Sequence, residues 1–239
     1  DAMTHRGPDD RGTHRAPGVA FGVRRLSVVD VEGGHQPFSN DDGSVWGMQN
    51  GELYNHAVLR EELQGAGHHF ASRCDTEVLP HLYEQDGDDL PARLMGMFGL
   101  AVWDDRRRRA LLARDRLGIK PLYYAEVGDV LVFGSELKSV LASGLIPPDL
   151  DYDAIDTYLT FGFFAAPTTP LARVRKLLPG HRLVVEYGRV RTEAYWHYPE
   201  PEVADPPLSE REYRDGLLDG LDTAVRRRLM SDVPLGAML

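Results

Sequence analysis

Residues 49–56, QNGELYNH, contain the dipeptide Asn50-Gly51, which is the strongest short signal for a two-residue hairpin turn. A hairpin would need a returning strand in which apolar and polar side chains alternate. The residues that follow, beginning Glu52-Leu53, do not alternate in this way. The stretch therefore leaves two interpretations open: a tight turn, or the end of a strand that faces a ligand.

The sequence around this stretch predicts a β-rich domain that extends to about Val190. Its short segments are rich in β-branched and aromatic residues and end at Gly, Asp or Asn. We predict a tight turn at 126–130 and a solvated hairpin turn at Arg106–Arg109. The predicted strands are 19–30, 44–50, 96–104, 109–115, 121–127, 129–136 and 181–190, and the predicted helices are 55–67, 75–87 and 136–144.

Two features of the helix at 75–87 are predicted in more detail. Asp75 or Thr76 is expected to be its N-cap, and Pro80 falls early enough to lie in its first turn or to bend the helix.

A change of composition follows this domain. Residues 197–208, HYPEPEVADPPL, are rich in proline and acid and predict an extended linker. Ser209 and Glu212 then form a capping box that begins an amphipathic helix. The last residues, LGAML, are expected to start a strand of a second domain.

Composition excludes several classes of protein. Of the 239 residues, 42% are hydrophobic and 27% are charged, so a sizeable core is expected. The net charge of −10 disfavours nucleic acid and anionic membranes as partners. The single cysteine, Cys74, is typical of a reducing compartment such as the cytoplasm. No metal site is expected, because His68-His69 has no ligand spacing around it.

Four polar stretches interrupt the apolar patterns: Arg25, Asn50-Gly51-Glu52, Asp75 and Arg114-Asp115-Arg116. By their chemistry, this set could bind a free amino acid. The guanidinium of Arg25 can hold a carboxylate. Glu52 and Asp75 suit an ammonium group. The Asn50 amide and the Gly51 N–H could converge on one oxygen, as in an oxyanion hole.

Taken singly, each of these groups has a plainer explanation. Asn50-Gly51 is more often a turn, Arg25 a surface or ion-paired residue, and Asp75 a helix cap. Spacing alone cannot place them in one pocket.

Seven further stretches stand out in chain order: HRGPDDRG at 5–12, RRLSVVD at 24–30, QNGELYNH at 49–56, CDTEVLPHLYEQDG at 74–87, GMFGLAVWD at 96–104, ARDRLGIKPLYY at 113–124 and FGSELKSVL at 133–141. Together and in this order, they resemble the class II glutamine amidotransferase domain. The segment SDVPLGAML at 231–239 resembles the approach to the synthetase domain in the asparagine synthetase family.

The resemblance implies an α+β fold. Residues 1–196 would form a glutaminase domain of the N-terminal-nucleophile hydrolase type, a four-layer αββα sandwich with antiparallel sheets. Residues 197–208 would be a linker, and residues 209–239 would begin an α/β ATP pyrophosphatase domain.

The resemblance also assigns roles to individual residues. Asn50 and Gly51 would form the oxyanion hole, and Glu52 and Asp75 would hold the α-ammonium of glutamine. The α-carboxylate would bind Arg25 and the backbone of Leu26, Ser27, Val28 and Val29. Leu239 would flank bound nucleotide. The segments 5–9 and 114–123 would support the site structurally.

The family reaction has two halves. An N-terminal cysteine first attacks the glutamine amide, forms a glutamyl thioester and releases ammonia. Ammonia then crosses to aspartate that ATP and Mg²⁺ have activated, which gives asparagine, AMP and pyrophosphate.

The chain as given has neither the N-terminal cysteine nor the pyrophosphate loop of the family. Cys74 has no free α-amino group and is expected only to place Asp75. The resemblance therefore implies that this polypeptide is a piece of an asparagine synthase that binds no cofactor and completes neither half-reaction. An unpaired sheet edge is expected where the first strand of the family is missing.

Alternatives remain open at this stage. The acceptor could differ from aspartate, as in β-lactam-forming relatives, or the domain could be a non-catalytic glutamine-binding module. A homodimer is one possible assembly.

Overall fold

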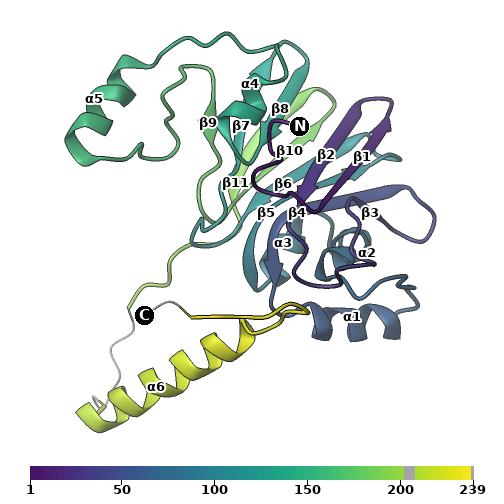
Figure 1. Cartoon of the computed structure of the whole chain (residues 1–239), viewed down its shortest axis with the longest axis vertical. Coiled ribbons are helices and arrows are strands. Elements are labelled where there is room, and N and C mark those ends of the chain that lie inside the picture. The colour runs from purple at the N-terminus through teal and green to yellow at the C-terminus, as the bar shows by residue number, and fades with distance from the viewer. Residues whose placement is uncertain (202–207, 238–239) are drawn as a thin grey trace.

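The central feature of the fold is a six-stranded antiparallel sheet (Figure 1). The computed structural model describes residues 1–201 and 208–237 of the chain. The sheet has the strand order β11-β10-β6-β5-β4-β3. The strands are β3 (Phe38–Ser39), β4 (Val45–Leu53), β5 (Gly96–Asp104), β6 (Arg109–Arg114), β10 (His181–Glu186) and β11 (Arg189–Ala194).

Two smaller antiparallel sheets lie against one face of this sheet. One is the hairpin of β1 (Asp10–Ala16) and β2 (Val19–Arg25). The other has the order β8-β7-β9. Its strands are β7 (Tyr123–Val127), β8 (Val130–Gly134) and β9 (Arg175–Lys176).

The helices lie on the outside of the sheets and at the two ends of the molecule. Helix α5 extends away from the sheets at the upper left of Figure 1, and α6 lies at the bottom. The α-helices are α1 (His56–Gly65), α2 (Val78–Asp86), α3 (Leu90–Arg93), α4 (Leu137–Leu141), α5 (Tyr152–Phe161) and α6 (Glu210–Arg227), and the 3₁₀ turns are η1 (Asp75–Glu77) and η2 (Gly87–Asp89).

Strand β5 shows how the sequence produces the layers. Side chains alternate between the two faces of a strand. Phe98, Leu100 and Val102 of β5 therefore pack in one buried cluster with α1 and α2. Ala101 and Trp103 point the other way, into a second cluster with Phe21 of β2.

A third cluster covers the outer face of the β8-β7-β9 sheet, where Val140 of α4 packs against Ala125 of β7. The order of layers is thus helix, sheet, sheet, helix. This is the predicted four-layer sandwich, except that its second β layer is split into two small sheets.

Several sequence predictions are confirmed. Asn50-Gly51 does not form a turn, because β4 continues through it to Leu53. The turns at 126–130 and 106–109 connect antiparallel pairs of strands. Ser209 and Glu212 form the predicted capping box at the start of α6.

Other predictions are wrong in detail. Asp75 does not cap a helix. It begins η1, and its carboxylate accepts hydrogen bonds from β4 instead. The strand predicted for 19–30 ends at Arg25, because a loop wraps around the guanidinium of that residue. Strand β1 and helix α5 were not predicted.

The C-terminal part of the chain is described only in places. The predicted linker falls largely on residues 202–207, which lie outside the described residues. Residues 235–237 do not form the strand predicted for LGAML. Within the described residues, no helix is both long and apolar enough to cross a membrane.

Candidate functional site

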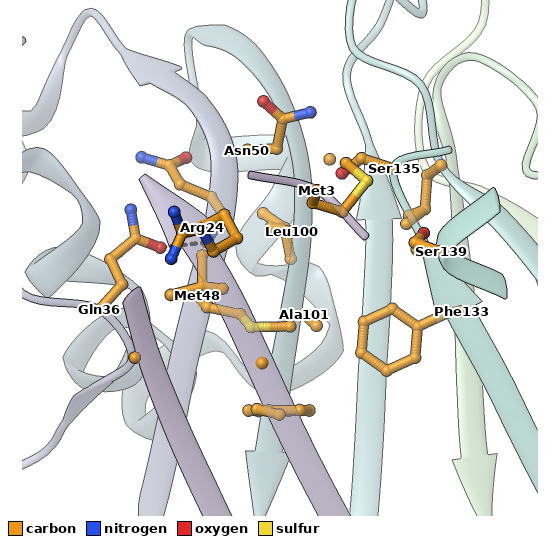
Figure 2. Close-up of a pocket in the computed structure, with 18 of the residues that line it drawn as sticks. Met3, Arg24, Gln36, Met48, Asn50, Leu100, Ala101, Phe133, Ser135 and Ser139 are labelled. Atoms are coloured by element: carbon orange, nitrogen blue, oxygen red, sulfur yellow. Dashed lines mark hydrogen bonds between the residues drawn. The ribbon is translucent and has the colours of Figure 1, made fainter. Parts of the chain in front are cut away.

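A cavity of about 1490 Å³ lies between the six-stranded sheet and the two smaller sheets. In Figure 2, Asn50, Met3 and Ser135 lie toward one end of the cavity, and Ala101 and Phe133 toward the other. Most of the predicted site residues line it: Arg25, Leu26, Val28, Val29, Asn50, Gly51, Glu52 and Asp75.

Two of the predicted site residues are not placed in the cavity. Ser27 is not among the lining residues, and its backbone N–H donates to the Asp9 carboxylate at 2.9 Å. Leu239 lies outside the described residues.

Arg25 organises the loop that borders the cavity. It is buried at the end of β2, and its guanidinium donates to the carbonyl oxygens of Val29, Asp30 and Val31 at 2.5, 2.9 and 3.4 Å. A guanidinium has five N–H donors, so two are not engaged by these carbonyls. A Cβ at Gly34 would lie 2.6 Å from Cζ of Arg25, so this loop position needs glycine.

Asp75 connects η1 to strand β4. The side chain is 4% exposed, and Oδ2 accepts hydrogen bonds from the backbone N–H of Leu53 at 2.8 Å and from Nε2 of Gln49 at 3.0 Å. These bonds fix the carboxylate at the cavity wall, because each involves a group of a central strand. The sequence alone suggested a cap because Asp75 immediately precedes a helix.

Glu52 is the second acid of the cavity. Burial raises the pKa of its carboxyl, and the negative charge of Asp75 raises it further, whereas Lys120 lowers it. The like charges of Glu52 and Asp75 repel each other, and a cation between them would reduce this repulsion. The pair is therefore suited to an ammonium group.

Asn50 supplies a donor that has no partner. Its Nδ2 is buried and makes no hydrogen bond with any described residue. A buried amide without a partner costs about 1–3 kcal/mol, so such a group calls for an acceptor. Asn50 lines the cavity, which is where that acceptor would bind.

Gly51 lies next to Asn50 on β4, opposite Phe98 of β5. A Cβ at this position would overlap the Met97 carbonyl oxygen and lie 2.7 Å from the Cα of Phe98. Only glycine therefore fits between β5 and the cavity.

The end of β6 and the loop that follows it hold Lys120 in place at the cavity. Arg114 donates to the carbonyl oxygens of Gly118, Lys120 and Leu177 at 2.7, 2.7 and 2.8 Å. Asp115 accepts from the backbone N–H of Lys120 at 2.9 Å. These bonds hold Lys120 at the cavity, where its charge acts on Glu52.

Cys74 is not suited to nucleophilic attack. The side chain is buried, and burial together with the charge of Asp75 raises the pKa of its thiol to about 12. A thiol of that pKa is almost entirely protonated at neutral pH, whereas the thiolate is the reactive form.

The residues after α6 contact the loop that Arg25 organises. The Asp232 carboxylate accepts from the backbone N–H of Asp30 at 2.7 Å, and the Asp232 N–H donates to the Val28 carbonyl at 2.9 Å. The same loop thus borders the cavity on one side and the C-terminal segment on the other.

Sequence reasoning missed several residues of the cavity. Arg24, Gln36, Gln49 and Lys120 all line it. Gln36 and Gln49 are linked, because the Gln49 N–H donates to Oε1 of Gln36 at 2.8 Å. None of them interrupts an apolar pattern in a way that would have identified it.

Solved structures share this fold. The glutamine phosphoribosylpyrophosphate amidotransferase of Bacillus subtilis, in complex with ADP and GMP, aligns with a TM-score of 0.54 and 22% identity over 75% of this chain and 35% of that chain. A structure described as the allosteric regulatory enzyme of purine biosynthesis aligns equally well, with a TM-score of 0.54 and 23% identity. At this level of identity the likeness shows the fold alone.

Residues 1–196 match the family model described as the glutamine amidotransferase domain. The chain therefore belongs to the class II glutamine amidotransferase domain family, and the resemblance seen in the sequence is confirmed.

Curated relatives agree with this assignment. Asparagine synthetase [glutamine-hydrolyzing] 1 of Bacillus subtilis is 36% identical over 99% of this chain, and the amidase chyE of Penicillium rubens is 35% identical over 100% of it. The chain covers 37% and 35% of these proteins, so it spans about a third of their length.

Proposed function

We propose that the cavity binds free glutamine and is the glutaminase site of an amidotransferase. The observation that carries this proposal is the buried Nδ2 of Asn50, which has no partner among the described residues and lies beside Gly51 on β4. Glu52 and Asp75 are close enough for their charges to interact. The α-ammonium group of glutamine would sit between them.

The other end of the substrate would bind the loop that Arg25 organises. The α-carboxylate would accept hydrogen bonds from the two N–H groups of Arg25 that the loop carbonyls do not use. The backbone of Leu26–Val29 would hold the same carboxylate. The side-chain amide oxygen of glutamine would then meet Asn50 and Gly51. As negative charge develops on that oxygen, these two donors would stabilise it.

A cysteine nucleophile completes this chemistry in the family, and Cys74 does not supply it, because its thiol is buried and protonated at neutral pH. Hydrolysis by a full-length protein would need a cysteine next to Asn50 and Gly51.

Calorimetry with glutamine tests this site. We expect the unmodified chain to give a heat of binding, and Arg25→Ala and Asp75→Ala to abolish it. Arg107→Ala, which changes an exposed side chain in the β5–β6 turn, should leave the heat unchanged. Unchanged binding by Arg25→Ala would show that the site assignment is wrong.

Two analogues separate the parts of the site. Glutaramic acid lacks the ammonium group and 4-aminobutanamide lacks the α-carboxylate, so each should bind more weakly than glutamine. The conservative variant Asp75→Asn keeps an oxygen for the Leu53 N–H but loses the charge. Circular dichroism confirms that each variant is folded before its heat is interpreted.

The pH dependence of binding tests the role of Glu52. Because its pKa is raised above the ordinary value for glutamate, this carboxylate takes up a proton at a higher pH than an ordinary glutamate. The ammonium group binds the ionised form, so affinity should be constant near neutral pH and fall as the pH drops toward the raised pKa. Glu52→Gln should bind weakly at every pH and lose this acid-side dependence.

The stability of Glu52→Gln is a further check. A carboxyl with a raised folded-state pKa destabilises the fold where it is ionised, so the neutral variant should be more stable than the unmodified chain above that pKa. Normal glutamine binding by Glu52→Gln would contradict the proposed role of Glu52 in holding the ammonium group.

For the full-length protein we propose asparagine synthesis. The ammonia would be transferred to aspartate activated by ATP and Mg²⁺, in a domain that follows the glutaminase domain (residues 1–196) and begins at about residue 209. The support is the 36% identity with three asparagine synthetases of Bacillus subtilis.

A second acceptor is a specific alternative, because two fungal relatives named amidases are 35% and 34% identical to this chain. Assay of the full-length protein for AMP formation with aspartate, and with other carboxylic acids, distinguishes the two.

A further inference from the structure

A cluster of potential metal ligands lies on the helical side of the large sheet, apart from the cavity. Asp41 belongs to the turn between β3 and β4, His68 follows α1, and His81 lies on α2. One ligand atom from each residue can be chosen so that all lie within 4.8 Å of one another. Three segments that are distant in the sequence therefore bring two imidazoles and a carboxylate to one point.

The spacing of the two imidazoles suits a metal ion. Nδ1 of His68 and Nδ1 of His81 lie 3.3 Å apart. Two nitrogens bound at about 2.0–2.1 Å to a tetrahedral zinc ion are about 3.3 Å from each other. The two rings are inclined at 71°, so their nitrogens face one another without stacking of the rings.

The surroundings hold these ligands in place. His81 is buried, and the ring of Phe70 packs against it with a centroid distance of 4.6 Å. The backbone N–H of His69 donates to the Asp41 carboxylate at 3.4 Å. Glu84 adds a carboxylate oxygen 3.6 Å from Nδ1 of His68. Asp41 is exposed, so an ion can enter from solvent and the carboxylate can adjust to it.

We propose that Asp41, His68 and His81 bind a divalent transition-metal ion of the zinc type, with water as the fourth ligand. Imidazole nitrogens with a carboxylate oxygen are ligands that such ions accept. The ion would fasten α2 to the β3–β4 turn. Helix α2 directly follows η1, where Asp75 lies, so the ion would also steady the segment that carries this acid.

This site is not evident from the sequence. His68 and His81 are separated by 13 positions, and Asp41 comes before α1. The adjacent pair His68-His69 suggested no ligand spacing, and indeed only His68 of that pair belongs to the cluster.

Titration with Zn²⁺ of the chain freed from metal by a chelator tests the proposal. We expect one equivalent to bind and to raise the melting temperature, because an ion that binds only the folded state stabilises it. Asp41 is exposed and His68 is only partly buried, so neither change empties the core. His68→Ala and Asp41→Asn should each weaken binding by about tenfold or more, since loss even of outer partners of a metal site costs about 10–100-fold. His197→Ala removes an exposed histidine elsewhere and should bind zinc normally.

Co²⁺ gives a readout that does not depend on stability. A four-coordinate site with nitrogen ligands should produce visible ligand-field absorption, and His68→Ala should lose it while His197→Ala retains it. Zinc binding that is absent, or equally strong in His68→Ala, Asp41→Asn and the unmodified chain, would overturn the proposal. Glutamine is not needed in any of these measurements, so they are independent of the proposed glutaminase site.

Discussion

Replacing Asp115 with alanine is expected to lower the free energy of unfolding by about 3–4 kcal/mol, a large share of the 5–15 kcal/mol typical of a domain. The carboxylate is 1% exposed and accepts four backbone N–H groups. Oδ2 accepts from Phe98 at 3.2 Å and Lys120 at 2.9 Å, and Oδ1 accepts from Leu117 at 3.2 Å and Ile119 at 2.9 Å. Alanine leaves all four donors without this acceptor.

Urea denaturation followed by circular dichroism measures the effect. Asp115→Asn keeps one carboxamide oxygen and should lose about half as much stability as Asp115→Ala, because two N–H groups are bound by each oxygen. Asp153→Ala changes an exposed aspartate on α5 and should stay within about 0.5 kcal/mol of the unmodified chain. Equal midpoints for Asp115→Ala and Asp153→Ala would contradict this account of the loop.

The same variant should also weaken glutamine binding in whatever fraction remains folded. Lys120 is held at the cavity through its backbone N–H, and its charge acts on Glu52 there. Loss of the Asp115 carboxylate frees the segment that carries Lys120. The stability of this loop and the electrostatics of the site are therefore linked.

The sequence predicted the elements whose patterns are local. The capping box at Ser209 and the turn at 126–130 depend only on neighbouring residues, and both form as predicted. Strand β1, DRGTHRA, was missed because it is polar, and its hydrogen bonds come from the partner strand β2. Helix α5 was missed although Asp151 caps it, because its apolar residues are largely exposed and mark no buried face.

The site was predictable only as a list of chemically suitable residues. Asn50, Glu52 and Asp75 were identified by type, but their common cavity depends on β4 and η1 meeting in space. The use of Arg25 to bind loop carbonyls could not be read from the sequence, because it depends on the path of residues 26–34 around the guanidinium. Lys120 was expected only as part of the supporting segment 114–123, because its effect on Glu52 depends on the path of the loop bound by Asp115.

Replacing Gly51 with alanine is expected to cost about 3 kcal/mol of folding stability and to abolish glutamine binding. The added methyl group would overlap the Met97 carbonyl oxygen and lie 2.7 Å from the Cα of Phe98. These are backbone atoms of the central strand β5, so no side chain can rotate to make room. The strand itself must move, and the β4–β5 pairing that positions Asn50 and Glu52 must move with it.

Gly22→Ala is the matched control, because Gly22 also lies in a strand and a Cβ there has nothing within 4 Å. It should be as stable as the unmodified chain or slightly more so, since alanine restricts the unfolded chain more than glycine does. Urea midpoints and glutamine calorimetry on both variants give the comparison. If Gly51→Ala folds as stably as Gly22→Ala and still binds glutamine, then close approach of β5 does not explain the glycine.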